Sequence, residues 1–141
     1  MNNIIVEKVW NDSDMMELHI VAESEFVRAH QTCYIQEADL QEIGHKMLKY
    51  VSEYGNQDLY VELGKKEGNF TPAFSMNFTK KDLSGHVNIE VDLEVPDIKD
   101  RSHRCKYFVQ GEIGAIERLG KGFLRIVTSD VGTMCSLYKT Y

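Results

Sequence analysis

The run His86-Val87-Asn88-Ile89-Glu90-Val91-Asp92-Leu93-Glu94-Val95 determines the fold class of this 141-residue chain. From Val87 to Val95 every second residue is apolar, and the residues between them are polar or charged. Because successive side chains of a strand point to opposite faces, this alternation predicts a strand with one face in the core and the other open to water or to a partner. The rest of the chain must then supply neighbouring strands and a layer that covers the apolar face.

Further runs with the same period of two predict a largely antiparallel sheet, since short turns connect most of them. The predicted strands are residues 4–10, 15–22, 26–35, 59–63, 73–79, 87–95 and 104–110. A turn-like segment at 64–69 and a polar loop at 96–102 separate the later strands.

Two segments have the helical period instead. Residues 37–54 carry one apolar stripe, with acidic residues in the first turns, lysines later and Gly55 as a C-terminal cap. Residues 113–127 form the second predicted helix, in which each glycine lowers the intrinsic stability by ~1 kcal/mol and permits close packing on a sheet. The first stripe consists of Leu40, Ile43, Met47, Leu48, Val51 and Tyr54, and the glycines of the second helix are Gly114, Gly120 and Gly122.

These elements predict an α+β domain in which one largely antiparallel sheet of six to seven strands carries both helices on one face. No repeat or Pro/Gly-rich linker divides residues 1–141, so a single domain is expected. Residues 128–141 show no strong period, and we expect them to form a frayed tail.

Composition excludes several classes of protein. The chain has 22 acidic and 16 basic residues, a net charge of −6, which argues against a nucleic-acid binder because such proteins need a basic face. No window approaches the roughly 20 apolar residues of a membrane span, and the N-terminus lacks the pattern of a signal peptide, so a cytoplasmic location without membrane contact is expected. The three cysteines, Cys33, Cys105 and Cys135, form no Cys-x-x-Cys pair and are expected to be free.

The strongest candidate for a binding site is the polar face of the 87–95 strand. Glu90, Asp92 and Glu94 project side by side at a spacing of about 6.5–7 Å, with His86 on the same face and Glu62 expected on a neighbouring strand. Such a row can receive the Lys and Arg side chains of a basic partner, bind a hard cation, or simply be solvated.

Other motifs give no catalytic centre. The segment 114–122 resembles a phosphate loop, but five residues separate Gly114 from Gly120, and Gly122 replaces the hydroxyl residue that would bind magnesium. No histidine lies at metal-ligand spacing from another histidine or a cysteine, so no metal or cofactor is expected. The basic cluster is interrupted by Asp97 and Asp100, which disfavours phosphate binding; it consists of Lys99, Arg101, His103, Arg104 and Lys106.

The runs Gly85-His86-Val87 and Glu112-Ile113-Gly114 resemble the C-terminal half of a family of small, uncharacterised bacterial proteins, over about residues 58–126. In size and acidity the chain is also similar to the immunity proteins that accompany bacterial polymorphic toxins. The family pattern carries no active site, so the resemblance implies a fold more than a function.

The sequence therefore favours a non-catalytic protein-binding module, an immunity-type inhibitor that neutralises a basic toxin domain through Glu62, His86, Glu90, Asp92 and Glu94. The alternative is a small metal- or ligand-dependent enzyme that uses Glu90 or Asp92 with His86 on the open sheet face. A third interpretation is a homodimer that buries this face, which light scattering would reveal. The oligomeric state and the identity of the partner stay open.

Overall fold

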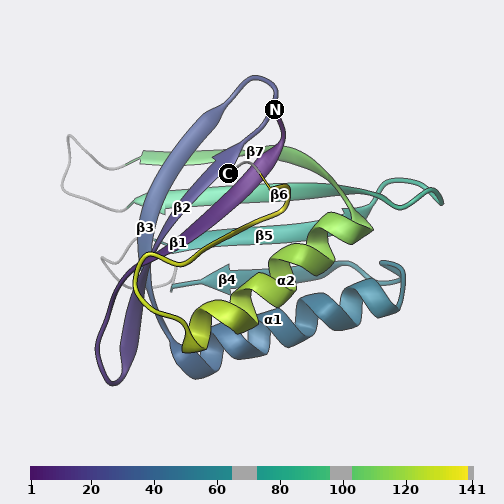
Figure 1. The fold of residues 1–141 in the computed structure, drawn as a ribbon. Helices are drawn as coiled ribbons and strands as arrows, with labels where there is room; N and C mark the ends of the chain where they lie inside the picture. Colours follow the sequence, from purple (N-terminus) through teal and green to yellow (C-terminus); the bar gives the residue numbers. More distant parts are fainter. Residues whose placement is uncertain (65–72, 96–102, 140–141) are drawn as a thin grey trace.

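The computed structural model describes residues 1–64, 73–95 and 103–139. Over these residues the chain forms two four-stranded antiparallel sheets and two helices (Figure 1). The first sheet has the strand order β3-β2-β1-β8, with β1 (Asn3–Asn11), β2 (Met15–Glu23), β3 (Arg28–Gln36) and β8 (Met134–Ser136). The second has the order β4-β5-β6-β7, with β4 (Leu59–Leu63), β5 (Ala73–Lys80), β6 (His86–Val95) and β7 (His103–Glu112).

The α+β class with antiparallel strands is confirmed, but the predicted single sheet with both helices on one face is not. The helix α1 (Glu37–Ser52) begins directly after β3, and β4 pairs only with β5 among the described strands. The helix thus separates two meanders, each of which pairs its consecutive strands locally. The predicted loop 96–102 lies outside the described residues, as does all of the predicted turn 64–69 except Gly64.

The two helices pack against each other in opposite directions (Figure 1). They approach closely at Gly44 of α1 and Gly120 of α2 (Ile113–Thr128), where a Cβ on Gly44 would lie 3.1 Å from the Gly120 carbonyl oxygen. The expectation that the α2 glycines pack on a sheet is correct for Gly122, which lies against Cys135 of β8, but Gly120 packs on a helix instead. Neither helix of the described part is long and apolar enough to cross a membrane.

The end of α1 also differs from the prediction. The helix stops at Ser52, and Tyr54 and Gly55 both have a positive φ, of 53° and 66°. This change of backbone direction takes Tyr54 off the helical period and leaves it 73% exposed, whereas Tyr50 occupies the buried position.

The expected frayed tail at 128–141 is wrong for its described part, up to Lys139. β8 pairs antiparallel with β1, and Cys135 and Leu137 are buried. The Asn3 side chain also bonds the backbone of Tyr138 through both its oxygen and its nitrogen. Pairing with a strand more than a hundred residues away therefore orders a segment that has no period of its own.

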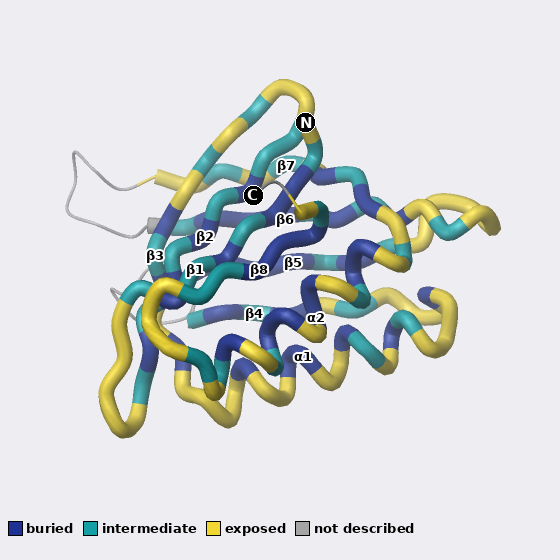
Figure 2. The backbone as a smooth tube through the Cα atoms, in the orientation of Figure 1, coloured by how far each residue is buried: buried dark blue, intermediate teal, exposed yellow. Residues whose placement is uncertain are grey.

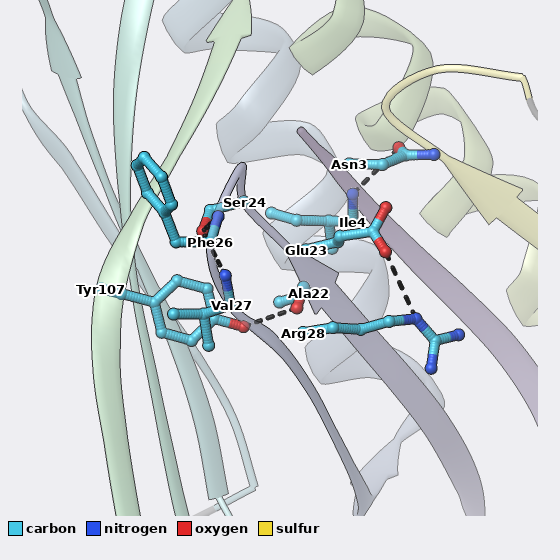
Figure 3. A network of polar contacts seen from close by, with 9 residues as sticks. All are labelled: Asn3, Ile4, Ala22, Glu23, Ser24, Phe26, Val27, Arg28 and Tyr107. Atoms are coloured by element: carbon cyan, nitrogen blue, oxygen red, sulfur yellow. Dashed lines mark hydrogen bonds and ion pairs between the residues drawn. The ribbon is translucent and has the colours of Figure 1, made fainter. Parts of the chain in front are cut away.

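The core is one cluster formed by the inner faces of both sheets and both helices, and Figure 2 shows these segments as buried. A tyrosine links the two sheets: the Tyr107 hydroxyl on β7 donates to the Ala22 carbonyl at the end of β2, at 2.5 Å (Figure 3). Beside it, the Ser24 hydroxyl accepts hydrogen bonds from the backbone amides of Phe26 and Val27, and these bonds close the β2–β3 turn.

Candidate functional site

The apolar and polar side chains of β6 lie on opposite faces of the second sheet, as the alternation in the sequence predicts. Val87, Ile89, Val91 and Leu93 are at most 2% exposed and face the core. The polar residues of β6 lie on the opposite side of the second sheet, which we call the outer face.

The strand register determines which residues of β4, β5 and β7 lie beside the polar residues of β6 on the outer face. Because opposite residues in an antiparallel pair share a face, residues of all four strands align in rows across the sheet. Two such rows are Tyr60–Asn77–Glu90–Phe108 and Glu62–Ser75–Asp92–Lys106, and a third, Ala73–Glu94–Arg104, spans β5, β6 and β7 only. Glu62 is therefore in the row of Asp92, but its strand is not the neighbour of β6 that was predicted. β5 lies between them with Ser75 in this row, so the backbones of Glu62 and Asp92 are about 10 Å apart.

Two basic side chains of β7 pair with the acidic row. Arg104 forms a bidentate ion pair with Asp92, with N···O distances of 2.7 and 3.1 Å, and the Asp92 side chain is only 8% exposed. Hydrogen bonding to Asp92, followed by its charge, raises the pKa of the Arg104 guanidinium. Lys106 lies 3.6 Å from Glu90. Arg104 and Lys106 belong to the basic cluster noted in the sequence. Of its other members, His103 is the first residue of β7, and Lys99 and Arg101 lie outside the described residues.

Aromatic side chains lie on both edge strands of the outer face. Tyr60 on β4 is 53% exposed and Phe108 on β7 is 51% exposed, in the same row as Glu90. The Tyr60 hydroxyl donates to the Glu62 carboxylate at 2.7 Å. Partial burial, and then this bond to Glu62, raise the pKa of Tyr60.

A groove of about 770 Å³ adjoins the outer face between β3, α1 and β4. Tyr34 and Tyr60 contribute aromatic surface to its lining, and Asp39, Glu42 and Glu62 contribute carboxylates. Lys46 also lines the groove and pairs with Glu42 at 3.1 Å. Tyr60 and Glu62 thus belong both to the groove and to the outer face, so the two form one continuous surface.

His86 lies apart from this surface. Its Nδ1 is 2.8 Å from the Asp82 carboxylate, at the start of β6. Four residues of extended chain, about 13 Å, separate it from Glu90. Desolvation works to raise the pKa of Asp82, but hydrogen bonds from the His86 ring and amide and from the Ser84 amide, together with the His86 charge, outweigh it and lower the pKa. His86 and the row Glu90–Asp92 therefore do not form a compact acid–base pair in this structure.

Two histidines that are distant in the sequence, His19 and His30, lie side by side in the first sheet. His19 Nε2 on β2 lies 3.4 Å from His30 Nδ1 on β3. In the β2–β3 register, in which the two residue numbers of each pair sum to 51, Thr32 lies directly opposite His19. His30 is two residues from Thr32 on the same face, so it is the diagonal neighbour of His19. The turn at 24–27 is the signal that would have revealed this, because the position of a hairpin turn fixes the register.

The runs Gly85-His86-Val87 and Glu112-Ile113-Gly114 meet in space. Gly85, with a φ of 90°, precedes β6, and its carbonyl accepts the amide of Ile113, the first residue of α2, at 2.9 Å. Both runs thus have a structural role at the junction of β6, β7 and α2. Comparison with protein-family models, with curated proteins and with solved structures gives no match to this chain.

Proposed function

We propose that the protein is a non-catalytic binding module that neutralises a basic protein domain, in the manner of an immunity protein, through the outer face of the second sheet and the adjoining groove. The observation that carries the proposal is the shared edge of these two surfaces, where Tyr60 and Glu62 lie on both. A partner can therefore contact carboxylates and aromatic rings together.

The charge balance of the surface supports a basic partner. In the three rows described above, the carboxylates of Glu62, Glu90, Asp92 and Glu94 face two cations, Arg104 and Lys106. This leaves a net charge of −2, and the groove adds Asp39 beside the Glu42–Lys46 pair. Such a potential accelerates encounter with a basic protein and disfavours acidic ones.

The aromatic side chains supply the second requirement of a protein interface. Tyrosine is enriched among the residues that dominate binding energy, and its ring also accepts cationic side chains over its face. Tyr34 and Tyr60 are 39% and 53% exposed beside carboxylates, so an Arg or Lys side chain of the partner can meet a ring and a carboxylate at one position.

The test is a charge-reversal variant with a matched control. Glu62→Lys/Glu90→Lys/Glu94→Lys reverses three carboxylates of the surface, while Asp92 keeps its pair with Arg104. The control, Asp14→Lys/Glu25→Lys/Glu53→Lys, changes the net charge equally at exposed positions outside the three rows and the groove. Tagged proteins are used to capture partners from the native host, and the captured protein is then titrated calorimetrically.

We expect a basic protein to be captured by the unmodified chain and by the control. The surface variant should bind it at least about 100-fold more weakly, and added salt should weaken the unmodified complex. An acidic partner, or equal loss of affinity in the surface variant and the control, would contradict the proposal. Equal thermal midpoints of the two variants would show that binding, not folding, has changed.

A further inference from the structure

His19 and His30 lie on the outer face of the first sheet, away from the surface proposed to bind a partner. His30 is exposed and His19 half-buried. Besides the 3.4 Å between His19 Nε2 and His30 Nδ1, the ring centroids are 5.5 Å apart with an interplanar angle of 66°. One nitrogen of each ring therefore points toward the other ring.

We propose that this histidine pair binds a divalent transition-metal ion that prefers nitrogen ligands, such as Zn²⁺, Ni²⁺ or Cu²⁺. Imidazole nitrogens bind Zn²⁺ at roughly 2.0–2.1 Å. Two nitrogens at that distance from one ion are about 2.9 Å apart for a right-angled arrangement and about 3.4 Å apart for a tetrahedral one. The observed separation of 3.4 Å thus equals the spacing of two nitrogens in a tetrahedral site.

The charges around the pair favour a cation. Glu7 on β1 lies opposite His19, and Glu17 is two residues from His19 on the same face of β2. The nearby cation Arg28 is paired with Glu23 at 3.4 Å. Among the described residues no group of three or more His, Cys, Asp or Glu side chains is placed to hold a metal, so water completes the coordination of this two-histidine site.

The backbone holds the two ligands in place before any ion binds. β2 and β3 pair without interruption from Met15–Gln36 to Glu23–Arg28, and His19 and His30 lie within this ladder. Little conformational freedom is then lost on binding, which favours chelation over binding by a single exposed histidine.

The experiment uses the whole chain and two probes, Ni²⁺ and Zn²⁺. Paramagnetic Ni²⁺ is titrated into the protein while the imidazole NMR signals are followed, and Zn²⁺ affinity is measured by calorimetry. We expect Ni²⁺ to broaden His19 and His30 first, and Zn²⁺ to bind with a stoichiometry of one. His19→Gln and His30→Gln should each reduce the Zn²⁺ affinity at least about tenfold.

His45→Gln is the matched control, because His45 is an exposed histidine on α1 without a histidine partner among the described residues. This variant should retain the full affinity. Equal broadening of His45 and His19, unchanged affinity in His30→Gln, or no binding at millimolar metal would overturn the proposal and leave the pair as a hydrogen bond between two rings. The variant spectra report folding directly, so a folding defect cannot be mistaken for lost binding.

Discussion

Lys8 is a charged residue in the core. It follows Ile4 and Val6 on the inward side of β1 and is only 2% exposed. Its Nζ donates to the carbonyl oxygens of Ile126 and Ser129 at 3.2 and 2.8 Å, at the C-terminus of α2. The last carbonyls of a helix lack intrahelical partners and carry partial negative charge. A lysine at this position donates hydrogen bonds to these carbonyls, and its positive charge is attracted to theirs.

Lys8→Met should therefore lower the free energy of unfolding by about 2–3 kcal/mol, because buried carbonyls lose a charged donor. Lys46→Met, at an exposed ion pair with Glu42, should change it by less than about 1 kcal/mol. Urea unfolding of the three proteins measures both effects. Equal stability of Lys8→Met and the unmodified protein would mean that the helix end does not depend on this lysine.

At the scale of elements, the sequence predicted most boundaries well. The second helix was expected at 113–127 and spans Ile113–Thr128, and the strand at 59–63 is β4 without change. Alternation and helical period are local properties, and burial on one face enforces them. β8 could not be predicted, because a three-residue strand has no detectable period and depends on its pairing with β1.

The contact between α1 and α2 gives a prediction with an internal control. A Cβ on Gly44 would lie 2.8 Å from Leu124 and 3.1 Å from the Gly120 carbonyl, so Gly44→Ala should lower the free energy of unfolding by about 1–3 kcal/mol. Gly114→Ala, also in a helix but with no atom within 4 Å of the added Cβ, should raise it by up to about 1 kcal/mol.

Thermal and urea unfolding of the two variants measure the difference. A loss of stability in both would point to a general intolerance of alanine, and a gain in both would show that the helices can move apart without cost.

At the scale of the molecule, the arrangement of the sheets could not be predicted. Alternation shows which residues of a strand share a face, but it does not show whether a strand after a helix joins the earlier sheet or begins another. The same limit applied to the candidate site. The sequence grouped Glu90, Asp92 and Glu94 on one face, but the pairs with Arg104 and Lys106 depend on the β6–β7 register.

Two buried thiols and one partly buried tyrosine make the stability of the whole molecule depend on pH. Burial raises the pKa of the Cys33 and Cys135 thiols to about 12, and burial raises that of Tyr107 to about 12 as well. The folded state thus holds these protons at a pH where the unfolded chain has lost them. Their contribution to stability is complete below pH 9, the ordinary pKa of the thiols, and is lost as pH rises toward 12.

Between about pH 9 and 11, we expect the free energy of unfolding to fall by up to about 1.4 kcal/mol per pH unit for each thiol. Urea unfolding at pH 7, 9 and 10.5 measures this fall. The double variant Cys33→Ala/Cys135→Ala should show a shallower dependence on pH, even though its stability at pH 7 is lower. A slope identical to that of the unmodified protein would contradict the role of the thiols.

The pairing of β1 with β8 has a consequence for synthesis on the ribosome. β1 precedes in the chain both its partner strand at 134–136 and the helix end that Lys8 binds, by more than a hundred residues. Until then β1 presents an open strand edge, and Lys8 has no carbonyls to bind. Nascent chains of this protein therefore complete their first sheet only after residues 134–136 have left the ribosome, and until then the edge of β1 can pair with strands of other chains.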